Sequence, residues 1–158
     1  MKDSLRTGIS FGLTSAVITT LGLMVGLHSG THSKIVVLAG ILTIAIADAF
    51  SDALGIHISK ESDNTQTTTQ VWVATISTFL AKFLFAMTFV VPVLFFTLSI
   101  AIIISLIWGL SILTLLSYMI AKSKKEAAWK IVGEHLMIAI VVIGITHWVG
   151  DFLGKIST

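Results

Sequence analysis

Residues 35–58 read IVVLAGILTIAIADAFSDALGIHI, an apolar run of 24 residues whose only acidic residues are Asp48 and Asp52. A bilayer core about 30 Å thick is crossed by roughly 20 apolar residues in a helix. The run therefore predicts a membrane-spanning helix. Its two aspartates are the feature that a functional interpretation has to explain.

Further apolar runs on both sides extend this prediction to five spans. The stretch 71–120 has no polar loop and would form roughly 75 Å of helix, too long for one crossing. Pro92 is its natural hinge, because proline lacks an N–H and clashes with the preceding turn. We predict an all-α protein with one transmembrane domain over residues 1–158 and spans at residues 8–27, 35–58, 71–91, 95–120 and 131–152.

The composition agrees with a membrane protein. Hydrophobic residues make up 55% of the 158 residues and charged residues 11%, against about 25% charged residues in an average soluble protein. The absence of cysteine excludes disulfides, thiolate metal sites and cysteine nucleophiles. The first run is longer than the roughly 7–15 apolar residues of a cleaved signal peptide, so we expect a retained helix.

Basic residues predict the orientation, because cytoplasmic loops are enriched in Lys and Arg. An inside N-terminus puts seven basic residues inside and two outside; the seven are Lys2, Arg6, Lys60, Lys122, Lys124, Lys125 and Lys130, and the two are Lys34 and Lys155. We therefore predict a cytoplasmic N-terminus, an external C-terminus and a location in the plasma or inner membrane. The scattered basic residues form no stripe for nucleic acid, so no nucleic-acid partner is expected.

Asp48 and Asp52 are the main candidates for chemistry. Spaced four residues apart, they lie on one helix face. A carboxylate inside a bilayer costs at least about 2.5–3.5 kcal/mol and usually marks a functional site. Two such groups repel each other unless a proton or cation sits between them, and hard divalent cations prefer oxygen ligands. The alternative is a structural ion pair with Lys82, in the middle of the third predicted span.

Small residues follow one face of the first predicted helix at alternating steps of four and three, namely Gly8, Gly12, Ser15, Thr19, Gly22 and Gly26. Such a face permits close helix packing, within one subunit or across a dimer. It would also suit the wall of a transport path, to which we assign Ser15, Thr19, Ser51 and Lys82. Both interpretations stay open.

Other titratable residues lie near the predicted span ends. His57 and Glu61, four residues apart, together with Glu134 would form a cytoplasmic entry for metal, although solvated interfacial pairs are the commoner case. His147 and Asp151 form a similar pair at the other end. We predict no enzymatic activity, because intramembrane aspartyl proteases use aspartates on different helices and no hydrolase or phosphate-loop motif is present.

Two segments resemble the vacuolar iron transporter family. Residues 12–22, GLTSAVITTLG, are similar to its opening helix, and residues 49–59, AFSDALGIHIS, to its second helix. The Pro92 hinge and the last helix, with GEH at 133–135 and THWVG at 146–150, are similar too. The resemblance implies five spans and a homodimer, with a path near the two-fold axis that moves ferrous iron or manganese out of the cytosol against protons.

Departures from that family affect the site. The family typically has Asp where this chain has Ser15, and Met then Glu where it has Asp52 and Ile56. These family ligands do not carry over, and Asp48 and Asp52 supply carboxylates at shifted positions. The cytoplasmic metal-binding insert is also absent, because only about a dozen polar residues follow Ser59. Exchanging a thioether for a carboxylate favours harder ions than Fe²⁺.

The sequence thus predicts a homodimeric, proton-coupled divalent-metal transporter. Asp48 and Asp52 would bind the ion, which is substrate and not cofactor, while Ser15 and Thr19 line its path. Two alternatives remain: a non-transporting scaffold or assembly protein on a transporter-like fold, and a transporter of protons or another small ion.

Overall fold

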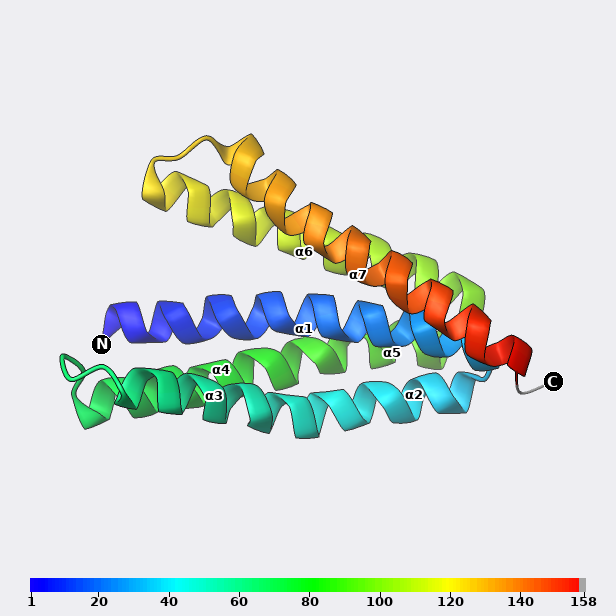
Figure 1. Cartoon of the computed structure of the whole chain (residues 1–158), viewed down its shortest axis with the longest axis horizontal. Helices are drawn as coiled ribbons and strands as arrows, with labels where there is room; N and C mark the ends of the chain where they lie inside the picture. The colour runs from blue at the N-terminus through cyan, green and yellow to red at the C-terminus, as the bar shows by residue number, and fades with distance from the viewer. Residues whose placement is uncertain (157–158) are drawn as a thin grey trace.

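A computed structural model describes residues 1–156, and this part of the chain is helical without strands (Figure 1). Its elements are α1 (Lys2–Thr31), α2 (Lys34–Thr43), the π-helical turn η1 (Ile44–Asp48), α3 (Ala49–Glu61), α4 (Thr68–Thr88), α5 (Val90–Phe95), α6 (Leu98–Lys124) and α7 (Ala128–Ile156). Within residues 1–156, five helical segments are long and apolar enough to cross a membrane, namely Lys2–Thr31, Lys34–Glu61, Thr68–Phe95, Leu98–Lys124 and Ala128–Ile156. This confirms the prediction of an all-α chain with five such helices.

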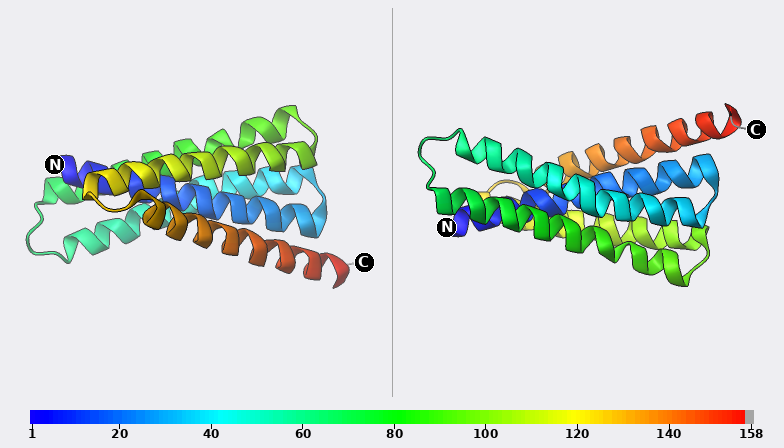
Figure 2. Two further views of the ribbon diagram at one scale, coloured as in Figure 1. Left: turned by 90° about the horizontal axis from the view of Figure 1, so that it is seen from above. Right: turned by 90° about the horizontal axis from the view of Figure 1, so that it is seen from below.

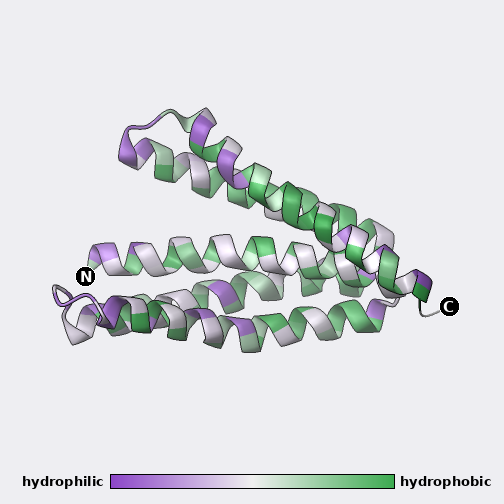
Figure 3. Ribbon diagram, viewed as in Figure 1, coloured by the Kyte–Doolittle hydropathy of each residue, from purple (hydrophilic) through white to green (hydrophobic). Residues whose placement is uncertain are grey.

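Helix α1 lies at the centre of the bundle. It packs against α4 on one side and against α6 and α7 on the other, while η1 and α3 run along α4 and α2 packs mainly against α1 (Figures 1 and 2). Successive long segments are antiparallel, so the two ends of the chain lie at opposite ends of the bundle. Hydrophilic residues gather at the ends and apolar residues cover most of the middle (Figure 3).

Glycines in α1 set its distance from two neighbouring helices. A Cβ on Gly8 would lie 2.5 Å from the carbonyl oxygen of Ala74, and one on Gly12 would lie 2.6 Å from that of Thr78, both in α4. Further along α1, a Cβ on Gly26 would lie 3.1 Å from the carbonyl oxygen of Thr146 in α7. The small-residue face therefore packs within the chain, first against α4 and then against α7.

The sequence suggested Pro92 as the hinge between the third and fourth segments, but the chain does not reverse there. Helix α4 ends at Thr88, and Pro92 lies in the first turn of the short helix α5. A proline is tolerated there because first-turn N–H groups lack intrahelical partners. The chain reverses at Phe96 and Thr97, where Phe96 is extended. The proline thus causes the break between α4 and α5, and the turn follows four residues later.

The loop between α3 and α4 is held by local hydrogen bonds. The hydroxyl of Thr65 donates to Asp63 Oδ1 at 2.7 Å, and the Thr65 N–H donates to the same oxygen at 3.0 Å. These bonds hold the pKa of Asp63 below its ordinary value. Thr67 and Gln70 then form a capping box that begins α4.

Candidate functional site

A buried lysine joins three helical segments in the middle of the bundle. Lys82 of α4 has no exposed surface, and its Nζ lies 2.5 Å from Oδ2 of Asp48 and 2.5 Å from Oδ2 of Asp52. The same Nζ donates to Oγ of Ser15 in α1 at 2.8 Å. The sequence placed Lys82 at the depth of Asp48, and the structure brings it to both aspartates. We call these four residues the charged cluster.

The two carboxylates differ in how they meet the ammonium group. Lys82 donates a hydrogen bond to Asp52, whereas its contact with Asp48 lacks hydrogen-bond geometry and leaves Asp48 Oδ2 buried without a hydrogen bond. The Asp48 side chain is 33% exposed and that of Asp52 19%. With all three groups ionised, the formal charge is −1. The cluster is therefore closed on the lysine side and open on the aspartate side.

The π-helical turn η1 aligns the two aspartates with Lys82. Buried residues before, within and after this turn recur at steps of four, at Val37, Ile41, Ala45, Ala49 and Ala53. A regular helix with 3.6 residues per turn would rotate such a stripe by about 40° at each step. A turn of π-helix holds more residues than a turn of α-helix, and it therefore compensates for part of this rotation. Such turns often occur at functional sites. The steps of four are visible only in the burial pattern, because apolar residues fill most of residues 35–50 and mark no single face in the sequence.

The close approach of α1 to α4 places Ser15 at the ammonium group. A Cβ on Gly12 would lie 3.1 Å from the backbone nitrogen of Lys82. Ser15 follows Gly12 by three residues and so lies on the same face of α1. A larger residue at position 12 would separate the two helices and remove the Ser15 hydroxyl from the cluster.

Within residues 1–156, two residues assigned to the transport path form no hydrogen bond with the side chains of the charged cluster. The hydroxyl of Thr19 donates to the carbonyl oxygen of Ser15 at 2.8 Å, a bond within α1. Ser51 is exposed on α3 beside Asp52, on the open side of the cluster. Of the predicted path residues, Lys82 therefore meets both aspartates directly, and Ser15 contacts the Lys82 ammonium group.

The predicted entry residues are only partly brought together. His57 Nδ1 lies 3.0 Å from Oγ1 of Thr75, and His57 Nε2 lies 3.8 Å from Oε2 of Glu61. Trp72 packs edge-on against the His57 ring. Glu134 is exposed on α7, across α1 from this group, and within residues 1–156 forms no ion pair with it. Sequence spacing could not reveal Thr75, because it comes from another helix.

The second histidine pair lies at the opposite end of the bundle. His147 Nε2 is 3.8 Å from Oδ2 of Asp151, as the spacing predicted, and Nδ1 of His147 is hydrogen-bonded to the Ser29 hydroxyl. This contact ties α7 to α1 beside the glycine packing described above. We interpret it as a helix–helix contact.

The cluster offers hard oxygen ligands. Asp48, Asp52 and Ser15 would supply two carboxylates and a hydroxyl, whereas Mg²⁺ and Ca²⁺ take six or more oxygen ligands. Within the described residues no group of three or more His, Asp or Glu side chains is arranged to hold a metal ion. Water or a second subunit would therefore have to complete the coordination.

Comparisons of the chain with protein-family models, with curated proteins and with solved structures give no match. The fold and the cluster define the class of protein at the level of architecture. The part of the chain that the structure describes has five helices long and apolar enough to span a membrane, and three helical segments meet at a buried lysine and two aspartates.

Proposed function

We propose that this protein is a homodimeric transporter of divalent metal ions that exchanges metal for protons. The observation that carries the proposal is the fully buried Lys82 ammonium held 2.5 Å from the partly open carboxylates of Asp48 and Asp52. Ionisable groups at such depth are costly and usually mark ion or proton pathways. Their arrangement supports a site where cations compete for one pair of carboxylates.

Lys82 would act as a tethered cation in the empty site. Its ammonium group would neutralise one of the two carboxylate charges when no metal is bound, so the empty protein would hold one net negative charge in the bilayer and not two. An entering divalent ion would repel the ammonium and displace it from the oxygens. Metal and protons compete for the same ligands, which would couple metal flux to a proton gradient.

A second copy would complete the site from its open side. Ala47, Ser51 and Gly55 are exposed on the same segment as Asp48 and Asp52, and nothing lies within 4 Å of a Cβ built on Gly55. Small exposed residues allow close helix association in lipid. Pairing of two such faces would remove the aspartates from lipid and enclose a path between subunits.

The basic residues support a cytoplasmic N-terminus. Export from the cytosol follows from the family resemblance, and we place the protein in a plasma or inner membrane. The ligand chemistry bears on the metal. Carboxylate and hydroxyl oxygens bind Mn²⁺ in preference to soft metal ions. Fe²⁺ remains within the substrate class that the family resemblance implies. We place Mn²⁺ first among the substrates to be tested.

A structural role is the second candidate, and one observation favours it. Lys82 is hydrogen-bonded to Asp52 and Ser15, so the cluster resembles a paired network that fixes helix register. The protein would then be a non-transporting membrane scaffold or assembly subunit. Transport of protons or another small ion through the same cluster is the remaining alternative.

Uptake by proteoliposomes tests the proposal. The purified protein would be assayed with Mn²⁺, Fe²⁺, Co²⁺, Zn²⁺ and Mg²⁺ under an imposed pH gradient. We expect saturable, gradient-dependent flux that Asp52→Asn abolishes. Asp151→Asn is the matched control, because it removes the same charge from an exposed pair outside the cluster. Absence of flux for every metal, from folded protein, would favour the scaffold or a different ion.

A further inference from the structure

The first turns of α1 carry a mixed basic and apolar face that the charged cluster does not use. Its residues, Lys2, Leu5, Arg6, Ile9 and Ser10, follow the i, i+3, i+4, i+7, i+8 spacing of one helix face. They line a groove of about 300 Å³ between α1 and α6. Basic side chains thus lie at the end of the groove nearest the N-terminus, and a serine lies two turns further in.

The groove exists because α1 and α6 diverge from a close crossing. A Cβ on Gly109 would lie 2.9 Å from Cδ1 of Leu21, so the two helices are in close contact there. Towards the N-terminal end of α1 they separate (Figure 1). The α6 wall of the groove is apolar and consists of Leu116, Met119 and Ile120.

Neither Lys2 nor Arg6 has a carboxylate partner within the described residues 1–156. Asp3 lies in the same helical turn but does not line the groove. The last turn of α6 adds the basic residues Lys122 and Lys124 at this end of the bundle. The groove therefore combines an unneutralised positive mouth with an apolar wall, which is the charge pattern complementary to an anionic amphiphile.

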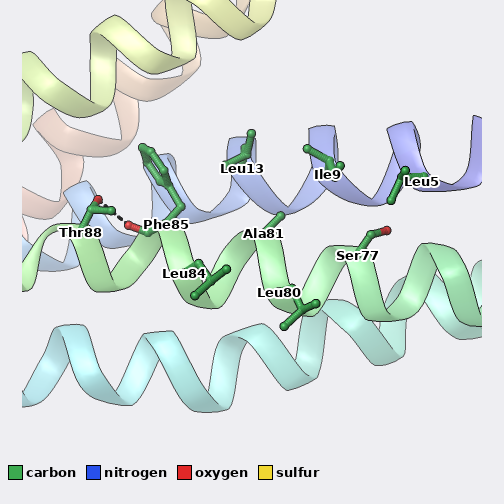
Figure 4. A pocket seen from close by; sticks show the side chains of 9 residues that line it. All are labelled: Leu5, Ile9, Leu13, Ser77, Leu80, Ala81, Leu84, Phe85 and Thr88. Atoms are coloured by element: carbon green, nitrogen blue, oxygen red, sulfur yellow. Dashed lines mark hydrogen bonds between the residues drawn. The ribbon is translucent and has the colours of Figure 1, made fainter. Parts of the chain in front are cut away.

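A neighbouring groove shows what the basic residues add. The space of about 470 Å³ between α1 and α4 shares Leu5 and Ile9, but its lining contains no charged residue (Figure 4). Ser77 and Thr88 are its only polar residues, and both hydroxyls donate to carbonyl oxygens of α4. Such a groove suits an acyl chain without selecting a headgroup. Selectivity for charge would arise only on the α6 side of α1.

We propose that the groove between α1 and α6 binds an anionic phospholipid. Its phosphate would contact Arg6 and Lys2, and one acyl chain would lie along Leu116 and Met119. Basic pockets between membrane helices on the cytoplasmic side are suited to such headgroups. This site does not depend on metal transport, and its end of the bundle is the one we assign to the cytosol.

Native mass spectrometry of the purified protein with phosphatidylglycerol or phosphatidylcholine tests the site. We expect preferential retention of phosphatidylglycerol. The double variant Lys2→Gln/Arg6→Gln should lose this preference, by about fivefold in affinity for each basic residue removed. Lys125→Gln/Lys130→Gln is the matched control, because it removes the same charge from exposed positions at the same end without altering the groove lining.

Three further measurements separate the occupants. Met119→Trp narrows the groove from an exposed position and should reduce retention of the lipid without loss of folding. If inorganic phosphate alone stabilised the protein as much as phosphatidylglycerol does, the basic mouth would be a site for free phosphate and the lipid site would be overturned. A change of oligomeric state in Lys2→Gln/Arg6→Gln would show that a second copy of the chain occupies the groove. Unchanged preference for phosphatidylglycerol in the same variant would also overturn the proposal.

Discussion

Lys82 Nζ, at the end of a side chain with no exposed surface, lies 2.5 Å from Oδ2 of Asp52, whose side chain is 19% exposed. The lysine thus depends entirely on its partners, whereas the aspartate keeps an open side. Asp48 is a second partner at the same distance. Loss of one aspartate leaves Lys82 paired, and loss of both leaves a buried charge without a carboxylate.

This asymmetry predicts a strongly non-additive effect on stability. Asp48→Asn should lower the free energy of unfolding by no more than about 1.5 kcal/mol, the upper value for one hydrogen bond. The Asp48 contact lacks hydrogen-bond geometry, and Lys82 keeps its hydrogen bonds to Asp52 and Ser15. Asp48→Asn/Asp52→Asn should lower it by ~3–5 kcal/mol, because an uncompensated buried charge remains. Chemical denaturation of the purified protein in mixed micelles measures both values.

The triple variant Lys82→Met/Asp48→Asn/Asp52→Asn is the control. It removes the buried charge as well as its partners, and uncharged replacements of a buried ion pair are often neutral or stabilising. We expect it to recover most of the loss. If the triple variant were as unstable as the double variant, packing and not charge would explain the effect.

Metal binding at the cluster predicts stabilisation that depends on the two carboxylates. Mn²⁺ at a concentration one hundred times its dissociation constant should stabilise the unmutated protein by about 2.7 kcal/mol. The effect should shrink at lower pH, because protons compete for the same oxygens. Asp48→Asn/Asp52→Asn should show no response, whereas Asp151→Asn should respond fully. Thermal unfolding with and without Mn²⁺ gives the comparison, and an equal response in the double variant would place the metal elsewhere.

The loop before α4 predicts a local pH response outside the membrane segments. The hydrogen bonds from Thr65 hold the pKa of Asp63 below its ordinary value. The ionised carboxylate therefore stabilises the folded loop at any pH above that ordinary pKa. This stabilisation is lost as the pH falls through the lowered pKa. The amide chemical shift of Thr65 in NMR spectra should report the transition, and Asp63→Ala should abolish it. A Thr65 shift that is constant from neutral to acid pH would contradict the hydrogen-bonded loop.

The sequence predicts the five apolar helices because their signal is local. Each span needs only enough consecutive apolar residues, and the polar loops after Thr31 and Glu61 separate them. The reversal after α5 was placed too early because Pro92 was the only conspicuous break. Proline also fits the first turn of a helix, and no local signal of comparable strength marks Phe96 and Thr97.

The candidate site could be predicted only in part. The spacing of Asp48 and Asp52 predicted that they share a helix face. The depth of Lys82 in the third span predicted it as a partner of Asp48. That Lys82 reaches both aspartates depends on the path of η1 and on the approach of α1. These are properties of helix packing, which sequence spacing within one helix does not contain.

The contact between α1 and α7 predicts opposite effects for two glycines of one helix. A Cβ on Gly150 would overlap the carbonyl oxygen of Gly26, whereas nothing lies within 4 Å of a Cβ on Gly144. Gly150→Ala should therefore destabilise the protein by about 1–3 kcal/mol, the usual effect of overpacking. Gly144→Ala should be neutral or stabilise it by up to about 1 kcal/mol, because alanine is the better helix former.

Unfolding of both variants in mixed micelles, beside the unmutated protein, separates packing from helix propensity. The backbone contact leaves no flexible side chain to move aside at Gly150, so α7 itself must shift away from α1. That shift should also weaken the contact between Ser29 and His147 and change the chemical shifts of the His147 ring in NMR spectra. If Gly150→Ala were as stable as Gly144→Ala and left His147 unchanged, the close approach of the two helices would be refuted.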